Sequence, residues 1–267
     1  MPIFRSRLVT VSGLRTHDRF CTAGAGLPVV LVHGLAVSHR YLMPTARALA
    51  GRHPVLVPDL PGFGRSDKPP AAWDVTRHAA HLGAWLDALG LGPVCLAGHS
   101  FGAEVVARLA AERPALVAGL VLAGPTTDPL ARSRIGLVRR FLVDMLVEAP
   151  SQAPMILRDV AVAGPRRVLA TVGHSVRNRI EDDLRRLRVR PLVLGGGLDP
   201  IAPLGWRASV AGATGGVAVT IPLAAHNVMT TSGRRSADAI AGYVASFSGT
   251  GGSVSNRRSG SPGVVRF

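Results

Sequence analysis

A serine flanked by glycines stands near the middle of the chain, where an apolar run gives way to a helical pattern. Residues 98–102, Gly-His-Ser-Phe-Gly, match the pattern G-x-S-x-G and follow the apolar run 93–97. On a sharp strand-to-helix turn, the Ser100 hydroxyl would project above a sheet, and the helix N-terminus would face a developing oxyanion. Gly98 and Gly102 would leave room for the crowded turn. We therefore expect Ser100 to be a nucleophile; the alternative is a serine that only caps the helix.

A serine hydroxyl needs a general base, and nine histidines compete for that role. His226 follows the apolar stretch 217–223 and precedes the last helical pattern, which places it at the same sheet edge as Ser100. Asp199 ends an apolar run that turns through three glycines, and a carboxylate there could fix the imidazole tautomer. Asp128, after the preceding strand, also satisfies the order Ser, Asp, His and stays open as the alternative carboxylate.

Short continuous apolar runs alternate with helical patterns along most of the chain. Such runs are typical of strands buried on both faces of a parallel sheet. We expect strands at 3–11, 14–20, 28–32, 55–57, 94–97, 116–122 and 191–194, and helices at 39–50, 75–89, 100–112, 203–211 and 234–247. The fold class predicted is α/β, with a doubly wound, mostly parallel sheet.

The alternation stops between residues 126 and 189, which hold amphipathic helical patterns and no convincing strand. We expect this stretch to be an inserted helical cap over the carboxyl edge of the sheet, or else a packing layer without a gating role. The core would then comprise residues 1–125 and 190–247. Residues 248–267 are rich in Gly, Ser and Arg, which predicts a disordered tail.

Two further motifs carry a family resemblance. Residues 31–34, Leu-Val-His-Gly, end a strand, and residues 58–67, Pro-Asp-Leu-Pro-Gly-Phe-Gly-Arg-Ser-Asp, form a glycine-rich turn after the next strand. Together with the serine turn and the later Asp and His, they resemble the α/β-hydrolase fold superfamily over about residues 8–247. The resemblance favours Asp199 over Asp128 as the carboxylate.

The same resemblance implies roles for the neighbours of the serine. The backbone N–H groups of Leu35 and Phe101 would form an oxyanion hole. His33 and Gly34 would support the loop that carries Leu35, and Asp59 would secure its turn. No metal or organic cofactor is implied.

Hydrolysis of a carboxylic ester or lactone through an acyl-enzyme on Ser100 is the leading expectation, with a small and largely apolar substrate. Carbon–carbon bond hydrolases of the meta-cleavage type typically resemble G-N-S-M-G at this turn and carry Trp after the histidine. This chain departs from them at His99, Phe101 and Asn227. Such a hydrolase, an acyltransferase and a non-catalytic small-molecule-binding protein remain the alternatives.

The chain is strongly basic, with 31 basic and 16 acidic residues and a formal net charge of +15. Arginines supply all of the basic residues except Lys68, and no zinc-finger spacing accompanies them. Specific nucleic-acid binding is therefore not expected. A cluster at 132–140, 166–167 and 177–190 could favour anionic substrates or surfaces.

Cys21 and Cys95 suggest no disulfide framework. The first 17 residues lack a long apolar segment, and no uncharged apolar stretch reaches the length of a membrane span. We expect no membrane span and a cytoplasmic location. The oligomeric state stays open.

Overall fold

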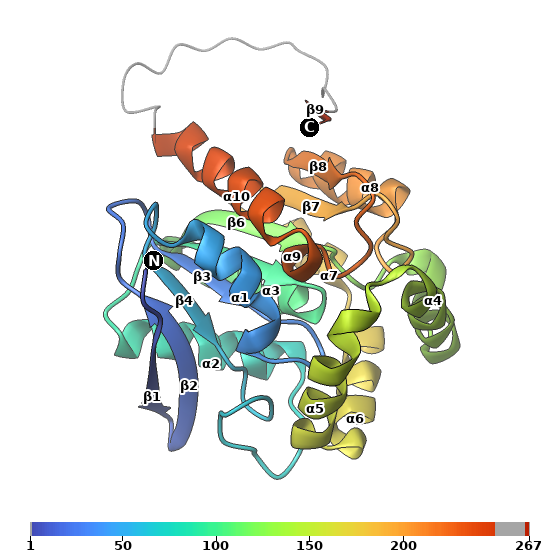
Figure 1. Ribbon diagram of the computed structural model, residues 1–267, viewed down its shortest axis with the longest axis horizontal. Helices are drawn as coiled ribbons and strands as arrows, with labels where there is room; N and C mark the ends of the chain where they lie inside the picture. The colour runs from blue at the N-terminus through green and yellow to red at the C-terminus, as the bar shows by residue number, and fades with distance from the viewer. Residues whose placement is uncertain (1, 249–264, 267) are drawn as a thin grey trace.

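The computed structural model describes residues 2–248 and 265–266, and its strands form one nine-stranded sheet (Figure 1). The strands are Arg5–Val11 (β1), Leu14–Cys21 (β2), Val29–Val32 (β3), Val55–Pro58 (β4), Val94–His99 (β5), Val117–Ala123 (β6), Leu192–Gly196 (β7), Val217–Ile221 (β8) and Val265–Arg266 (β9). Their order is β1-β2-β4-β3-β5-β6-β7-β8-β9. β2 pairs antiparallel with β1 and β4, and the other pairs are parallel. The predicted doubly wound, mostly parallel α/β sheet is confirmed.

Helices cover both faces of this sheet because its central strands are apolar at consecutive positions. In β3, Val29 and Leu31 enter one core cluster, whereas Val30 and Val32 enter the other. The first face is covered by His39–Leu49 (α1), Val228–Thr231 (α9) and Gly233–Ser248 (α10); the second by Val75–Ala88 (α2), Phe101–Glu112 (α3) and Leu204–Thr214 (α8). Every predicted core helix is present, with ends shifted by a few residues.

Residues 126–189 contain helices and, as predicted, no strand. The helices are Arg134–Val147 (α4), Ala153–Ala163 (α5), Pro165–Arg177 (α6) and Ile180–Leu184 (α7). Short 3-10 turns occupy Pro129–Ala131 and Pro150–Gln152, and another, Pro114–Leu116, precedes β6. Figure 1 shows α4, α5 and α6 grouped on one side of the molecule. α7 differs from them because it packs on α3 and α8, and it places Ile180 and Leu184 in the core.

The end of the chain is described in part. Residues 249–264 and 267, for which the sequence predicts a disordered tail, lie outside the described residues. The backbone of residues 265–266 pairs with the edge strand β8. Both cysteines are buried and free. None of the described helices combines the length and apolar character needed to cross a membrane.

Candidate active site

Ser100 occupies the sharp turn between β5 and α3, with φ 56° and ψ −121°. A non-glycine residue rarely adopts a positive φ, so the surrounding packing must hold this conformation. A Cβ atom on Gly98 would lie 2.2 Å from the carbonyl oxygen of Gly102, and a Cβ on Gly102 would lie 2.4 Å from that of Val32. The two glycines therefore permit a close approach of strand and helix that no larger residue would allow.

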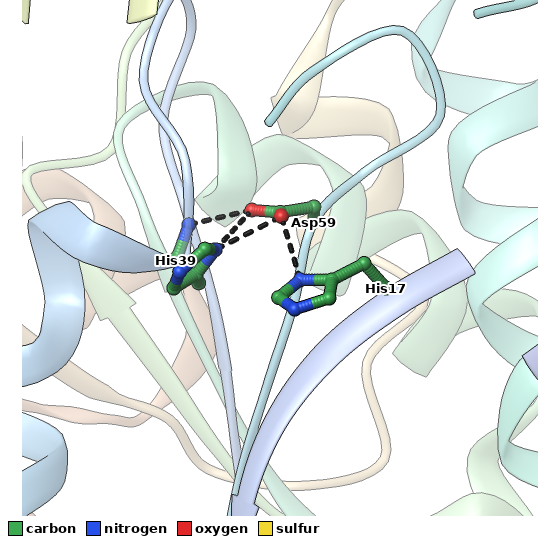
Figure 2. A group of neighbouring side chains, drawn as sticks. All are labelled: His17, His39 and Asp59. Atoms are coloured by element: carbon green, nitrogen blue, oxygen red, sulfur yellow. Dashed lines mark hydrogen bonds and ion pairs between the residues drawn. The ribbon is translucent and has the colours of Figure 1, made fainter. Parts of the chain in front are cut away.

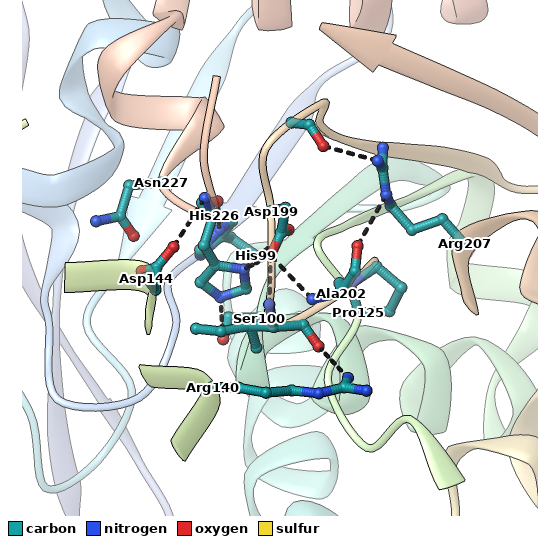
Figure 3. A network of polar contacts seen from close by, with 12 residues as sticks. His99, Ser100, Pro125, Arg140, Asp144, Asp199, Ala202, Arg207, His226 and Asn227 are labelled. Atoms are coloured by element: carbon teal, nitrogen blue, oxygen red, sulfur yellow. Dashed lines mark hydrogen bonds and ion pairs between the residues drawn. The ribbon is translucent and has the colours of Figure 1, made fainter. Parts of the chain in front are cut away.

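The structure brings Ser100, His226 and Asp199 together (Figure 3). Nε2 of His226 lies 3.0 Å from the Ser100 hydroxyl oxygen, and Nδ1 lies 3.0 Å and 3.1 Å from the two oxygens of Asp199. A carboxylate only accepts, so the proton belongs on Nδ1, which leaves Nε2 free to accept the serine proton. The backbone N–H groups of Ile201 and Ala202 donate to Asp199 at 2.9 Å and fix its position.

The charges in this site favour an ionised Asp199 beside His226. Burial by itself raises the pKa of Asp199, but the His226 charge, the bond to that ring and the Ala202 N–H lower it to about 2. Burial also opposes the charged form of His226, and the attraction of Asp199 overcomes it, so the pKa of His226 lies above its usual value. The imidazolium that would form on proton transfer is thus stabilised by its neighbour.

Asp128, the alternative carboxylate, has other partners. Its side chain lies 2.6 Å from the guanidinium of Arg140 and accepts the N–H of Leu130 at 3.0 Å. Arg140 also donates to the carbonyl oxygen of Ile201 at 2.9 Å, and so ties α4 to the loop that carries Asp199. The structure therefore brings Asp199 to the histidine and leaves Asp128 in an ion pair with α4.

The loop after β3 lies against the serine. A Cβ on Gly34 would be only 3.1 Å from Cβ of Ser100, and Leu35 lines the same cavity as the serine. His33 Nδ1 donates to the carbonyl oxygen of Gly34 at 2.7 Å, and its Nε2 accepts the N–H of Leu60 at 2.9 Å. Burial lowers the pKa of His33, which fits a neutral ring that braces this loop. Phe101, the first residue of α3, follows Ser100 directly.

The Asp59 side chain connects β2, the start of α1 and the turn after β4; Figure 2 shows its contacts with His17 and His39. Its carboxylate accepts from Nδ1 of His17 and of His39 at 2.9 Å, and from the backbone N–H groups of His39 at 2.7 Å and Arg65 at 3.0 Å. Burial raises its pKa, but the bonds to the two histidines lower the pKa far below its usual value. In the described part of the chain this is the one cluster with ligands suited to a metal. Its oxygens are already occupied by donors that order the turn.

Sequence reasoning missed the role of His99. Its Nε2 donates to the carbonyl oxygen of His226 at 2.9 Å, and the two rings are 4.8 Å apart. Tyr41 lies 3.3 Å from the same nitrogen and donates to the side chain of Asn227 at 2.6 Å. The loop that carries His226 is thus attached to the serine turn. The only sequence feature that could have indicated this contact was a polar residue, His99, within the G-x-S-x-G motif.

A second missed feature is a pair of carboxylates at one end of α4. Oδ1 of Asp144 accepts the backbone N–H of His226 at 3.3 Å, and Glu148 accepts that of Asn227. Burial raises the pKa of Asp144 to about 6, while the charge of His226 opposes this rise. Asp144 and Glu148 are four residues apart, a spacing that places two side chains on one face of a helix. This spacing was the sequence feature that could have indicated the pair.

Arg207 and Gly124 complete the surroundings of Asp199 and were also missed. The buried guanidinium of Arg207 donates to the carbonyl oxygens of Ala202 at 2.9 Å and Gly196 at 2.7 Å, which secures both ends of the Asp199 loop. Gly124 has φ 52°, and a Cβ there would lie 3.0 Å from Cε1 of His226. No local sequence pattern marks either residue.

A cavity of about 380 Å³ opens beside the serine. Ser100 and His226 lie in its wall, and apolar side chains from the loop after β3 and from the helices of segment 126–189 form most of the rest; they are Leu35, Val37, Val138, Phe141, Leu142, Met145, Ile156, Val168 and Val172. Asp144 and Glu148 add negative charge, and no arginine or lysine is among the described residues that line it. This volume suits a small molecule.

Comparison with known proteins agrees with this architecture. Residues 28–145 match the family model of the alpha/beta hydrolase fold. The chain is 30% identical over 229 residues to 2-hydroxy-6-oxo-2,4-heptadienoate hydrolase of Pseudomonas putida, which covers 74% of this chain and 80% of that enzyme. A thermophilic esterase from Thermogutta terrifontis has a similar structure, with a TM-score of 0.75 and 26% identity over 91% of this chain and 98% of that chain.

An uncharacterized protein of Mycobacterium tuberculosis is 33% identical over 189 residues, or 66% of this chain and 52% of that protein. The chain thus spans about half the length of the mycobacterial relatives that it matches. By fold, motif order and similarity along most of its length, the chain belongs to the α/β-hydrolase fold family.

Proposed function

We propose that this protein is a serine hydrolase that cleaves a carboxylic ester or lactone through an acyl-enzyme on Ser100. The continuous contact from Ser100 through His226 to Asp199, at 3.0 Å for each step, is the observation that supports this most strongly. In the first step, His226 takes the serine proton while Oγ attacks the substrate carbonyl carbon. The C–O bond of the ester or lactone then breaks, and its alkoxide oxygen takes that proton; an ester releases the alcohol, whereas a lactone keeps the new hydroxyl on the acyl group. In the second step, His226 activates water, which releases the acid and restores the serine.

The developing oxyanion would be stabilised by backbone N–H groups rather than by a charged side chain. Phe101 offers its N–H at the start of α3, where the helix dipole is positive, and Leu35 lies on the loop packed against Ser100. Loss of one such donor typically lowers turnover by about 10²–10³-fold.

The lining of the cavity favours a substrate whose acyl group is apolar and carries no negative charge near α4. Its wall is mainly apolar, and Asp144 and Glu148 would repel a carboxylate placed beside them. The substrate named for the Pseudomonas putida relative is a dienoate, which carries such a carboxylate. An uncharged ester or lactone therefore fits this cavity better, and carbon–carbon bond hydrolysis is the second candidate because of the similarity to that relative.

Helices α4, α5 and α6 are proposed to act as a cap. Each contributes at least one residue to the cavity wall: Val138 from α4, Ile156 from α5 and Val172 from α6. Their packing would then set the length of acyl chain that the site accepts. The alternative from the sequence, a packing layer without influence on the substrate, predicts no change in selectivity when these residues are altered.

A substrate panel tests the proposal. We expect turnover of p-nitrophenyl esters with short to medium acyl chains or of lactones, slower turnover of acyl chains that end in a carboxylate, and little or no cleavage of a hydroxy-oxo-dienoate. Ser100→Ala should abolish turnover and labelling by a fluorophosphonate probe. Dienoate cleavage with inert esters would favour the second candidate. Absence of both turnover and labelling in the wild type would favour a small-molecule-binding protein.

A further inference from the structure

The outer surface of α4, α5 and α6 concentrates exposed apolar side chains. The described residues include 17 strongly exposed large apolar side chains, and eleven of them lie within residues 130–169. On α4, Ile135 is 83% exposed and Leu146 is 86% exposed, and Leu157 on α5 and Leu169 on α6 are each 68% exposed. α6 packs against both α4 and α5, and the exposed side chains of these three neighbouring helices are here called the α4–α6 face. Apolar side chains that gather on an exposed surface commonly mark an interaction site.

Arginines outnumber acidic residues in the segment that forms the α4–α6 face. Residues 130–169 contain seven arginines and three acidic residues, and two of the acids, Asp144 and Asp159, are buried. Four exposed arginines have no ion pair within the described residues: Arg134, Arg139, Arg158 and Arg166. Exposed apolar side chains and unpaired arginines on the same helices are typical of a helix that lies in the headgroup region of an anionic lipid layer.

We propose that the α4–α6 face docks on an anionic lipid–water interface. The apolar side chains would enter the boundary between headgroups and acyl chains, and the arginines would contact the phosphates. A second copy of the chain fits this face less well, because pairing would bring two arginine-rich surfaces together. A nucleic acid would satisfy the arginines but would leave the apolar side chains exposed to water.

The α4–α6 face adjoins the cavity of the candidate active site. Val138, Leu142 and Met145 line the cavity beside Ser100 and are also exposed on the surface of α4. Docking would therefore turn this wall of the cavity toward the lipid, and an apolar substrate could enter without crossing bulk water. The docking itself does not depend on the proposed ester hydrolysis, because it uses side chains outside the catalytic group.

Vesicle cosedimentation with the full chain tests docking. We expect binding to vesicles of phosphatidylcholine with about one third phosphatidylglycerol, and little binding to phosphatidylcholine alone. The double variant Ile135→Glu/Leu146→Glu changes two side chains outside the cavity wall and should weaken binding by about tenfold or more. Ile3→Glu/Leu204→Glu adds the same charge at exposed apolar positions elsewhere and serves as the matched control.

A second pair of variants tests whether vesicle binding depends on the arginines of the α4–α6 face or only on the net charge of the protein. Arg134→Gln/Arg139→Gln should weaken binding by about fivefold for each arginine removed. Arg234→Gln/Arg235→Gln removes the same charge from the exposed side of α10 and should have a much smaller effect. Equal losses in both variants would mean that only the net charge attracts the protein to vesicles, and the proposal would be wrong.

Two further outcomes would overturn the proposal. A separate measurement checks that the variants are folded. If the glutamate variant of the face binds vesicles as the control does, the apolar side chains do not dock. If the wild type is a dimer by light scattering that Ile135→Glu/Leu146→Glu dissociates, and it ignores vesicles, a second copy covers the face. Circular dichroism checks folding, and Ile135→Ser/Leu146→Ser provides a milder variant with the same expected direction. Binding is measured without turnover, so docking can fail while ester hydrolysis stands.

Discussion

The carbonyl oxygen of His226 accepts a hydrogen bond from Nε2 of His99, which precedes Ser100 in the chain. The bond spans 2.9 Å and joins residues 127 positions apart. Burial lowers the pKa of His99 to about 3, so the ring is neutral and holds one proton for this bond. We therefore expect His99 to position the histidine of the candidate triad through the backbone of His226.

Replacing His99 by phenylalanine should lower kcat about tenfold or more and leave KM nearly unchanged, because a small displacement of the base is costly. His78→Phe is the matched control. His78 is also buried, and neither of its ring nitrogens has a hydrogen-bond partner among the described residues. Steady-state kinetics on a p-nitrophenyl ester would compare the two variants. Equal kcat values in His99→Phe and the wild type would show that the contact does not position the base.

The pH dependence of kcat/KM should report the neutral form of His226. Its pKa lies above the usual value because Asp199, Asp144 and Glu148 favour its charged form, so activity should rise with pH through that raised pKa. Asp144→Asn keeps an oxygen for the His226 N–H but removes a negative charge. The acid limb should then move to lower pH, by a few tenths to about one unit.

The exposed Asp182→Asn provides the control for this shift, since it removes an equal charge from a carboxylate whose described partner is Arg185. Asp144→Asn should also accept acyl chains that end in a carboxylate better than the wild type does. An unchanged acid limb in Asp144→Asn, or an equal shift in Asp182→Asn, would contradict the assigned influence of Asp144.

Glu104 should make stability fall as pH rises. This buried carboxylate of α3 accepts hydrogen bonds from Thr126, Ser175 and Asn178, and so connects the serine helix to residues 126–178. Burial raises its pKa from 4.5 to about 7, so the folded state binds the proton more tightly than the unfolded chain. The free energy of unfolding should therefore decrease between pH 4.5 and 7, by at most about 3 kcal/mol from this group.

Urea denaturation of the wild type and Glu104→Gln at pH 5 and pH 8 measures this effect. The glutamine keeps an acceptor for the two hydroxyls and cannot ionise. The free energy of unfolding of Glu104→Gln, relative to that of the wild type, should therefore be lower at pH 5 than at pH 8. Other carboxylates titrate equally in both proteins, and the difference isolates Glu104. A difference that does not change with pH would show that Glu104 keeps an ordinary pKa.

Gly124→Ala should disturb the candidate site, in addition to the backbone strain that φ 52° imposes on alanine. Its Cβ would press on Cε1 of His226 and lie 3.3 Å from Oδ2 of Asp199. We expect kcat to fall about 10- to 100-fold. Gly242→Ala is the control because a Cβ there meets nothing within 4 Å, and it should leave kcat unchanged and slightly stabilise α10. Equal kcat values for the two variants would exclude a steric role of Gly124.

Local patterns predicted most of the fold because they record what a strand or helix needs by itself. Apolar residues at consecutive positions, as in 29–32 and 94–97, are typical of a strand covered on both faces, which favours a parallel sheet. The glycines around Ser100 mark the sharp turn for a steric reason that is also local. These local features are sufficient to predict that Ser100 and His226 lie at one edge of the sheet.

The partners across the chain were decided by the tertiary structure. Asp199 and Asp128 both satisfied the chain order, and only the packing of α4 brought Arg140 to one and left the other facing His226. Likewise, His99 holds His226, and Asp144 reaches its backbone, through contacts between residues 82 to 127 positions apart. A hydrogen bond depends on distances of a few tenths of an ångström between atoms that side-chain packing brings together, and no periodicity along the sequence encodes those distances.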